Sequence, residues 1–286
     1  MTPIPGVFRR PAAIGLSAAA LTLLAACSSG GSGSSTGTPA STGTTAAATG
    51  SAATGSAATG SAGSALLTAA TQAQNINSAA TTLHVQVTGS QASSETGTFQ
   101  YQRTPTLMSE DMHIAAEGGN TGIKMILTGT DMYFSEPGLP AGKAWIKFSL
   151  AALKGKSASF ARLVQSMQSN NFTNQAQLFA VAKNAHEVGT ATIDGVATTE
   201  YAGSFRASDA INALSPGVRG VLGAQLKTLG DSVISFHEWI DGQHHMRQVI
   251  ENETVKGQAV TTTLNVTAIN QPVQIPLPPA SQTASS

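Results

Sequence analysis

Apolar and polar residues alternate with a period of two along a long stretch of the chain that begins near residue 83. Leu83, Val85 and Val87 are separated by polar His84 and Gln86, which is the pattern of a strand with one buried face. The same alternation recurs at Phe99 and Tyr101; at Met108, Met112 and Ile114; at Ile123, Met125 and Leu127; at Met132 and Phe134; and in residues 145–148. Gly, Pro and Asn residues separate these segments, so we expect an antiparallel meander.

The period changes to that of a helix in the middle of the chain. Helical spacing links Phe160, Leu163, Val164 and Met167, then Leu178, Phe179 and Ala182, and Pro216 opens a helix that includes Leu222. A short amphipathic helix is expected over 65–76. Strands are expected around an Asp194-Gly195 turn and over 232–240, 245–251 and 259–269, with a Lys256-Gly257 turn between the last two. This order of strands, helices and strands predicts an α+β fold, a curved antiparallel sheet with helices over one face.

The N-terminus has the layout of a secretory signal. Arg9 and Arg10 precede an apolar run over 12–26, which is shorter than the ~20 residues that a membrane span needs. The run ends in Leu24-Ala25-Ala26-Cys27, which resembles the bacterial lipobox. The resemblance implies cleavage between Ala26 and Cys27 and attachment of diacylglycerol and palmitate to that cysteine. An ordinary secretory signal that is cut elsewhere near Ala26 is the alternative.

Composition divides the rest of the chain. Residues 27–64 are almost entirely Ser, Gly, Thr and Ala, with the five-residue repeat Gly-Ser-Ala-Ala-Thr at 50–59, and contain no charged residue. Such a segment has no large apolar side chain to bury, so we expect a disordered tether. We therefore expect a signal peptide over 1–26, a tether over 27–64, one folded domain over 65–270 and an irregular Pro-rich tail over 271–286.

Charge and cysteine content exclude several classes of protein. The formal net charge is zero, and removal of the signal would leave a slight excess of acidic residues. A nucleic-acid partner would require a basic footprint, and electrostatic attraction to anionic lipid would require a polybasic segment. The sequence has neither feature, so we expect no nucleic-acid partner and no membrane binding through surface charge. The single cysteine is Cys27, so the folded domain has no disulfide.

No set of residues forms a recognisable catalytic or metal motif. His244 and His245 are adjacent, and adjacent strand residues point to opposite faces, which makes them a poor chelating pair. The expected folded domain over 65–270 has no Gly-x-Ser-x-Gly, His-Glu-x-x-His or phosphate-loop motif. We therefore expect neither an enzyme nor a cofactor. A hydrolase would require side chains around His237, Glu238 or Asp241 to converge in a deep pocket.

Methionines are concentrated in one stretch of the expected sheet, at Met108, Met112, Met125 and Met132. Methionine is flexible and is common on adaptable apolar binding surfaces. An ordinary core is the other interpretation of this cluster, and the pattern alone does not decide between them.

Three sets of short motifs lie in the second half of the chain: Val188-Gly189 with Ile193-Asp194-Gly195-Val196 and Tyr201, Trp239-Ile240-Asp241-Gly242 with Arg247 and Val249, and Trp145-Ile146-Lys147. These motifs resemble those of the LppX/LprG lipoproteins of actinobacteria and, more distantly, of the LolA and LolB carriers. Residues 243–246 depart from the shorter Gly- or Pro-containing turn of those proteins. The resemblance implies a half-barrel whose helices cover its concave face over an apolar cavity that holds acyl chains.

These observations predict a lipid-anchored protein at the outer face of the cytoplasmic membrane that binds an envelope lipid or glycolipid. Whether an exporter or acceptor protein is its partner is left open by the sequence. A ligand-free envelope scaffold is the alternative. The residues expected to line the cavity are Val85, Val87, Phe99, Tyr101, Met112, Ile114, Met125, Leu127, Met132, Phe134, Leu163, Met167, Phe179, Leu222 and Phe236.

Overall fold

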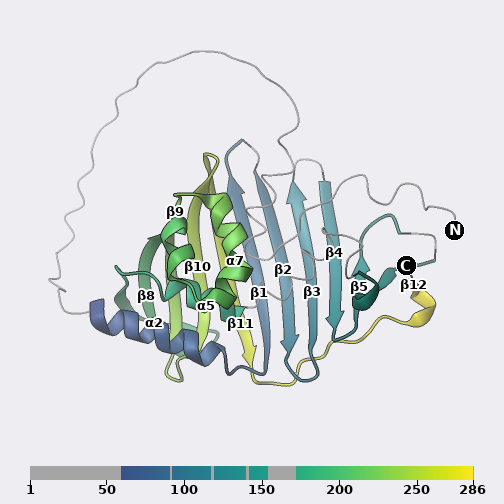
Figure 1. Ribbon diagram of the computed structural model, residues 1–286, viewed down its shortest axis with the longest axis horizontal. Helices are drawn as coiled ribbons and strands as arrows, with labels where there is room; N and C mark the ends of the chain where they lie inside the picture. Colours follow the sequence, from purple (N-terminus) through teal and green to yellow (C-terminus); the bar gives the residue numbers. More distant parts are fainter. Residues whose placement is uncertain (1–58, 91, 117–118, 140–141, 154–171, 286) are drawn as a thin grey trace, which may run out of the picture.

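The computed structural model describes residues 59–90, 92–116, 119–139, 142–153 and 172–285. Within them, twelve strands form one sheet in the order β12-β6-β5-β4-β3-β2-β1-β11-β10-β9-β8-β7 (Figure 1). The strands are β1 (Ser78–Thr88), β2 (Ser93–Gln102), β3 (Leu107–Ala116), β4 (Gly119–Thr128), β5 (Asp131–Ser135), β6 (Trp145–Ser149), β7 (His186–Ile193), β8 (Val196–Arg206), β9 (Val233–Asp241), β10 (Met246–Val255), β11 (Gln258–Ile269) and β12 (Thr283–Ser285). All neighbours are antiparallel except β12 and β6. The predicted α+β fold is confirmed.

Tight turns set the register of the hairpins. Asp194 and Gly195 both have positive φ, at 49° and 80°, and so do Lys256 and Gly257, at 50° and 81°. Two successive residues with positive φ match the twist of the strands that they connect, and glycine adopts this conformation without a steric penalty. The β7–β8 and β10–β11 hairpins therefore follow from the predicted turn residues.

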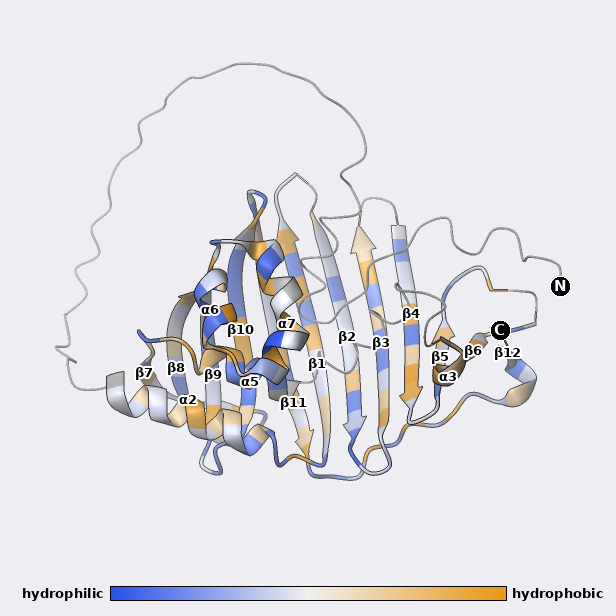
Figure 2. Cartoon of the chain, viewed as in Figure 1, coloured by the Kyte–Doolittle hydropathy of each residue, from blue (hydrophilic) through white to orange (hydrophobic). Residues whose placement is uncertain are grey.

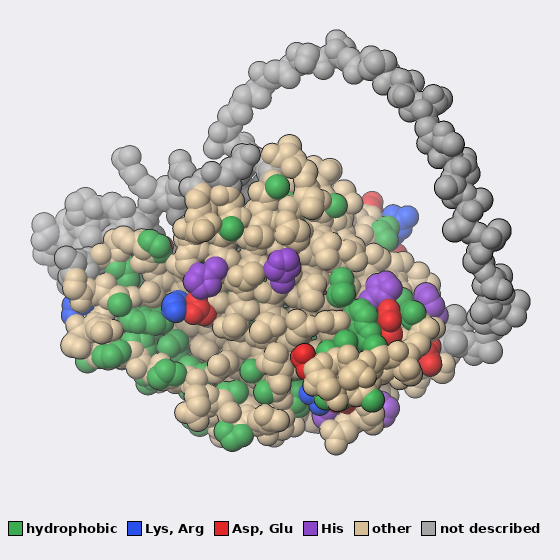
Figure 3. Space-filling model, turned by 180° about the vertical axis from the view of Figure 1, so that it is seen from behind, with side chains coloured by type: hydrophobic (Ala, Val, Ile, Leu, Met, Phe, Trp, Pro, Cys, Tyr) green, Lys and Arg blue, Asp and Glu red, His purple; other side chains and the backbone are tan. Residues whose placement is uncertain are grey.

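The sheet has two chemically different faces. In β1, buried Leu83, Val85 and Val87 alternate with the partly or fully exposed Thr82, His84 and Gln86. We call the face that carries Val85 the inner face and the opposite one the outer face. The hydrophobic and hydrophilic positions of β3 and β4 alternate in the same way (Figure 2). The outer face is dominated by uncharged polar side chains, with scattered histidines (Figure 3).

Helices cover part of the inner face, as Figure 1 shows. They are α2 (Thr59–Ala73), α3 (Leu150–Leu153), α5 (Phe172–Phe179), α6 (Ala207–Ala213) and α7 (Pro216–Leu229). One buried apolar cluster joins Leu66 of α2, Phe179 of α5 and Leu222 of α7 to inner-face residues of the sheet. Pro216 starts α7, where its missing N–H costs nothing, and Gly230 ends it.

Three elements differ from the sequence prediction. The first helix begins at Thr59 instead of 65, and Ala62 is fully buried. Alanine is the best helix former and packs closely, so a tract of small residues need not be a linker. Helices α3 and α6 are too short to give a clear periodic pattern. The helix expected around Leu163, the signal peptide and Cys27 lie outside the described residues.

The C-terminal tail is also more ordered than predicted. Residues 273–279 lack helix or strand, as their prolines require, but β12 then pairs in parallel with β6. On the way, Ile275 packs against Ile126 and Tyr133 in a small buried cluster. This segment therefore covers apolar side chains on the outer face of β4 and β5.

None of the helices in the described part of the chain is both long enough and apolar enough to span a membrane.

Candidate ligand-binding face

The structure brings most of the predicted lining residues together on the inner face and the helices that cover it. The buried cluster contains Val85, Val87, Phe99, Tyr101, Met112, Met125, Leu127, Met132, Phe179, Leu222 and Phe236, and Phe134 packs against it. Ile114 is half-buried and pairs with Glu95 across the strands, on the same face. Leu163 and Met167 lie outside the described residues. That these residues line a cavity for a ligand stays a prediction.

One half of the inner face is rich in methionine. Met108, Met112, Met125 and Met132 are at most 2% exposed and come from β3, β4 and β5. Register places them close together, because Met108 pairs with Leu127 and Leu127 pairs with Met132. We call the inner face of β1–β6 the methionine half.

The other half is filled by aromatic rings. The ring of Phe236 on β9 lies 4.9 Å from that of Phe179 on α5 and 6.2 Å from that of Phe205 on β8, centroid to centroid. Gly203 makes room for this ring, because a Cβ at position 203 would lie 2.9 Å from Phe236 Cζ. We call the inner face of β7–β11 the aromatic half.

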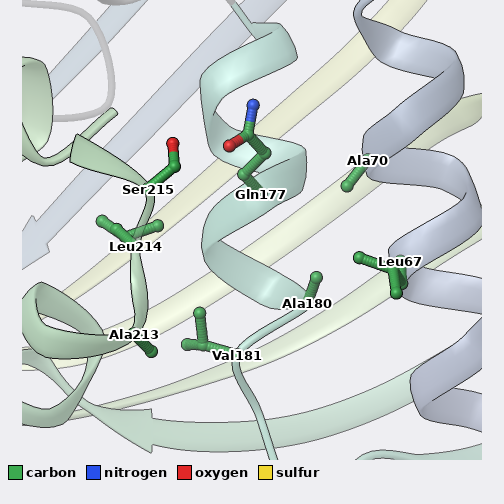
Figure 4. A pocket seen from close by; sticks show the side chains of 8 residues that line it. All are labelled: Leu67, Ala70, Gln177, Ala180, Val181, Ala213, Leu214 and Ser215. Carbon is green, nitrogen blue, oxygen red and sulfur yellow. The ribbon is translucent and has the colours of Figure 1, made fainter. Parts of the chain in front are cut away.

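A small pocket opens between the helices (Figure 4). It has a volume of about 190 Å³, and its walls come from α2, α5 and the segment that joins α6 to α7. The lining residues are Leu67, Ala70, Gln177, Ala180, Val181, Ala213, Leu214 and Ser215. Leu67 is 61% exposed, which is unusual for so large an apolar side chain in this molecule. None of the predicted cavity residues lines this pocket. It is smaller than the ~300 Å³ at which small-molecule sites usually begin.

The inner face also carries buried acids, of which the sequence analysis named only Glu238, as part of a possible hydrolase site. Glu95, Glu110 and Glu238 are 1%, 3% and 1% exposed. Both carboxyl oxygens of Glu95 and Glu238 and one of Glu110 have no hydrogen-bond partner. Strand parity could have revealed them, because Glu95 shares its parity with Phe99 and Glu110 shares its parity with Met112.

Burial changes the acidity of these groups. It raises the pKa of Glu95 to about 7. Burial and, secondarily, the negative charge of Glu95 raise the pKa of Glu110 to about 8. In the aromatic half, burial and the neighbouring Glu251 raise the pKa of Glu238 to about 8. A carboxyl group that is removed from water prefers its neutral form, which explains the common direction of these shifts.

The polar residues around the β9–β10 turn do not form a catalytic site. His237 contacts Glu200 at 2.7 Å on the outer face, whereas Glu238 lies on the inner face. Asp241 accepts hydrogen bonds from the N–H groups of Gln243 and His245 and from Arg247. Burial alone would raise the pKa of Asp241, but these hydrogen bonds outweigh it and lower the pKa. The candidate hydrolase residues therefore do not converge.

Groups of three or more metal-ligating side chains are absent from the described residues. His244 has a positive φ of 62° in the turn, and His245 donates its backbone N–H to Asp241. This pair holds a turn in place, which is a sufficient reason for the unusual residues 243–246.

Comparison with known proteins shows similarity of structure at low sequence identity. No family model matches the sequence, and no curated protein matches it. The structure is similar to the crystal structure of LprF from Mycobacterium bovis, with 13% identity, a TM-score of 0.47, and coverage of 77% of this chain and 98% of that one. It is also similar to the lipoprotein LppX from Mycobacterium tuberculosis, with 18% identity, a TM-score of 0.42, and coverage of 76% of this chain and 99% of that one.

Proposed function

We propose that this chain is an envelope lipoprotein that holds the acyl chains of a lipid or glycolipid between its sheet and its helices. The observation that carries the proposal is the inner face itself, on which one apolar cluster extends from Met132 on β5 to Phe205 on β8. Taking a methylene group out of water contributes ~0.8 kcal/mol, so an acyl chain on such a face would bind without any bond being made or broken.

We assign the entrance for the acyl chain to the pocket between α2, α5 and the α6–α7 segment. Its walls are mainly apolar, and Leu67, Val181 and Leu214 border the gap between the helices (Figure 4). A volume of about 190 Å³ holds only part of a long acyl chain. Binding therefore requires side chains beneath the helices to move, and the flexible methionines of the methionine half are suited to this.

The N-terminal segments would place this domain at its membrane. A diacylglycerol on Cys27 supplies two acyl chains, which suffices for stable anchoring where one chain does not. The domain would then stand at the outer face of the cytoplasmic membrane, with the segment from 27 as its tether. An exporter or acceptor protein would complete a transfer route.

Extraction of the purified lipoprotein followed by mass spectrometry of the bound lipids tests the proposal. We expect lipid in the wild-type chain and clearly less in Leu67→Asp, because a carboxylate at the pocket mouth opposes an acyl chain. Leu277→Asp is the matched control, because Leu277 is 53% exposed and is not among the pocket residues. A chain that yields no lipid and binds no added long-chain alcohol would contradict lipid binding.

The aromatic half favours the second candidate, a ligand-free envelope scaffold. Its rings contact one another directly, as an ordinary core does. Recovery of a stable protein partner together with a lipid-free chain would support that function instead.

A further inference from the structure

The inner face has surplus hydrogen-bond acceptors. Within the described residues, the buried inner-face side-chain atoms that lack a partner are all oxygens, from Glu95, Glu110, Glu238 and Gln258. Lys124, Lys147 and His237 lie on the outer face of their strands. Arg247, at a β-bulge, binds Asp241 through its guanidinium. Inner-face positions of the described strands therefore offer these oxygens no cationic side chain.

Glu95 and Glu110 form the part of this surface that lies in the methionine half. Across β2 and β3, Glu95 pairs with Ile114, Gly97 with Met112, and Phe99 with Glu110. Gly97 thus leaves a position without a side chain between the two acids. A Cβ at position 97 would lie 3.3 Å from Met112 Cγ, so the Met112 side chain covers this position.

This geometry selects among polar groups. An ammonium group has three donors and no acceptor, so it complements Glu95 and Glu110 in their ionised form, which presents only acceptors and prevails above their raised pKa values. A hydroxyl group would bring further acceptors that find no donor there. A carboxylate or phosphate would add like charge to buried acids, which is the most unfavourable case.

We infer that the methionine half takes an amphiphile with a primary ammonium group, which Glu95 and Glu110 bind over Gly97 after Met112 swings aside. This inference rests on the proposed function, because it assigns the polar end of the ligand whose apolar chain the inner face would hold. The flexible thioether side chain of Met112 makes it a movable cover, which a β-branched residue would not be.

The test is calorimetric titration of the full-length chain carrying Cys27→Ser with three matched probes below their micelle concentrations, at about pH 8.5. Dodecylammonium should bind at least tenfold more tightly than dodecanol, and dodecanoate should bind most weakly. The variant Glu95→Gln/Glu110→Gln should bind dodecylammonium no more tightly than dodecanol while its affinity for dodecanol is unchanged. Glu200→Gln, an outer-face control, should preserve the preference.

Three outcomes would overturn the inference in different ways. Equal binding of all three probes, or a preference for dodecanoate, would disprove ammonium recognition and leave lipid binding intact. Absence of binding by every probe would contradict the proposed function as well. Dodecyltrimethylammonium separates charge from hydrogen bonding, since binding as tight as that of dodecylammonium would show that donor N–H groups are not required.

Discussion

The two halves of the inner face bury apolar surface by different means. In the aromatic half, Phe236 is held between Phe179 and Phe205, and Gly203 lies directly beneath its ring. In the methionine half, four unbranched methionine side chains fill much of the buried space, alongside Phe99 and Tyr101. Rings in contact make a rigid core, whereas methionine side chains adopt many conformations at little cost.

The difference indicates where the molecule can accommodate a ligand. A face filled by tilted rings in contact opens only by losing those contacts, which stabilise the fold. A face in which methionines fill much of the space can be rearranged without breaking one particular contact. We therefore assign the stability of the domain chiefly to the aromatic half and its adaptability to the methionine half.

Removal of the central ring should have the largest effect. Phe236→Ala should lower the free energy of unfolding by ~3–5 kcal/mol, because the side chain is fully buried and leaves a cavity between two other rings. Denaturant unfolding measures the loss. Met125→Ala, also in a fully buried position, is the matched variant, and we expect a loss of only ~2 kcal/mol because flexible neighbours can fill the space. Equal losses would contradict the distinction between the halves.

The two inner-face glycines give a closer comparison. Gly203→Ala places a Cβ 2.9 Å from Phe236 Cζ and 3.3 Å from the Ala185 backbone, so we expect a destabilisation of ~1–3 kcal/mol. Gly97→Ala meets the Met112 side chain and the Asp111 carbonyl oxygen at 3.3 Å. The Met112 side chain can move, and the loss should stay below ~1 kcal/mol. Thermal unfolding of both variants measures the difference, and the reverse order would show that the methionine half is the more rigid one.

The buried acids predict how stability changes with pH. Folding raises the pKa of Glu95 to about 7 from its ordinary value of 4.5, so the folded chain holds a proton that the unfolded chain has lost. Stability therefore falls as pH rises between these values and levels off above them. Relative to wild type, Glu95→Gln should gain ~1–3 kcal/mol on going from pH 5 to pH 8.

Unfolding experiments at the two pH values measure this gain. Glu187→Gln is the control, because Glu187 is exposed on the edge strand β7. An unchanged pH dependence in Glu95→Gln would mean that this carboxyl group is ionised in the folded chain.

Patterns with a short period predicted the fold well. Alternation identified the strands and the buried parity of residues such as Val85 and Met125, and the Asp194-Gly195 and Lys256-Gly257 turns were predicted from residue type. The same parity also placed Glu95 and Glu110 on the inner face. They were missed because charged residues are usually exposed, and only the structure shows that they are buried.

Features that depend on distant segments could not be predicted. The pocket joins Leu67, Val181 and Leu214, which are far apart in sequence and meet only when α2, α5 and the α6–α7 segment pack together. Likewise, Ile126 has outer-face parity and is buried in a cluster that includes Ile275 of the C-terminal tail. No local sequence pattern in either segment indicates that the two segments will be in contact.

Replacing two methionines of the methionine half by leucine should have the smallest effect on stability but a clear effect on ligand binding. Met125→Leu/Met132→Leu conserves apolar volume, so we expect less than ~1 kcal/mol of destabilisation. It replaces flexible side chains with branched ones, so binding of dodecanol, which needs the methionine half to rearrange but brings no charge to it, should weaken several-fold. Met246→Leu is the matched control, because Met246 is equally buried but lies in the aromatic half opposite Ile240. If Met246→Leu weakens binding as much as the double variant does, adaptability is not confined to the methionine half, and the ligand must reach across both halves of the inner face.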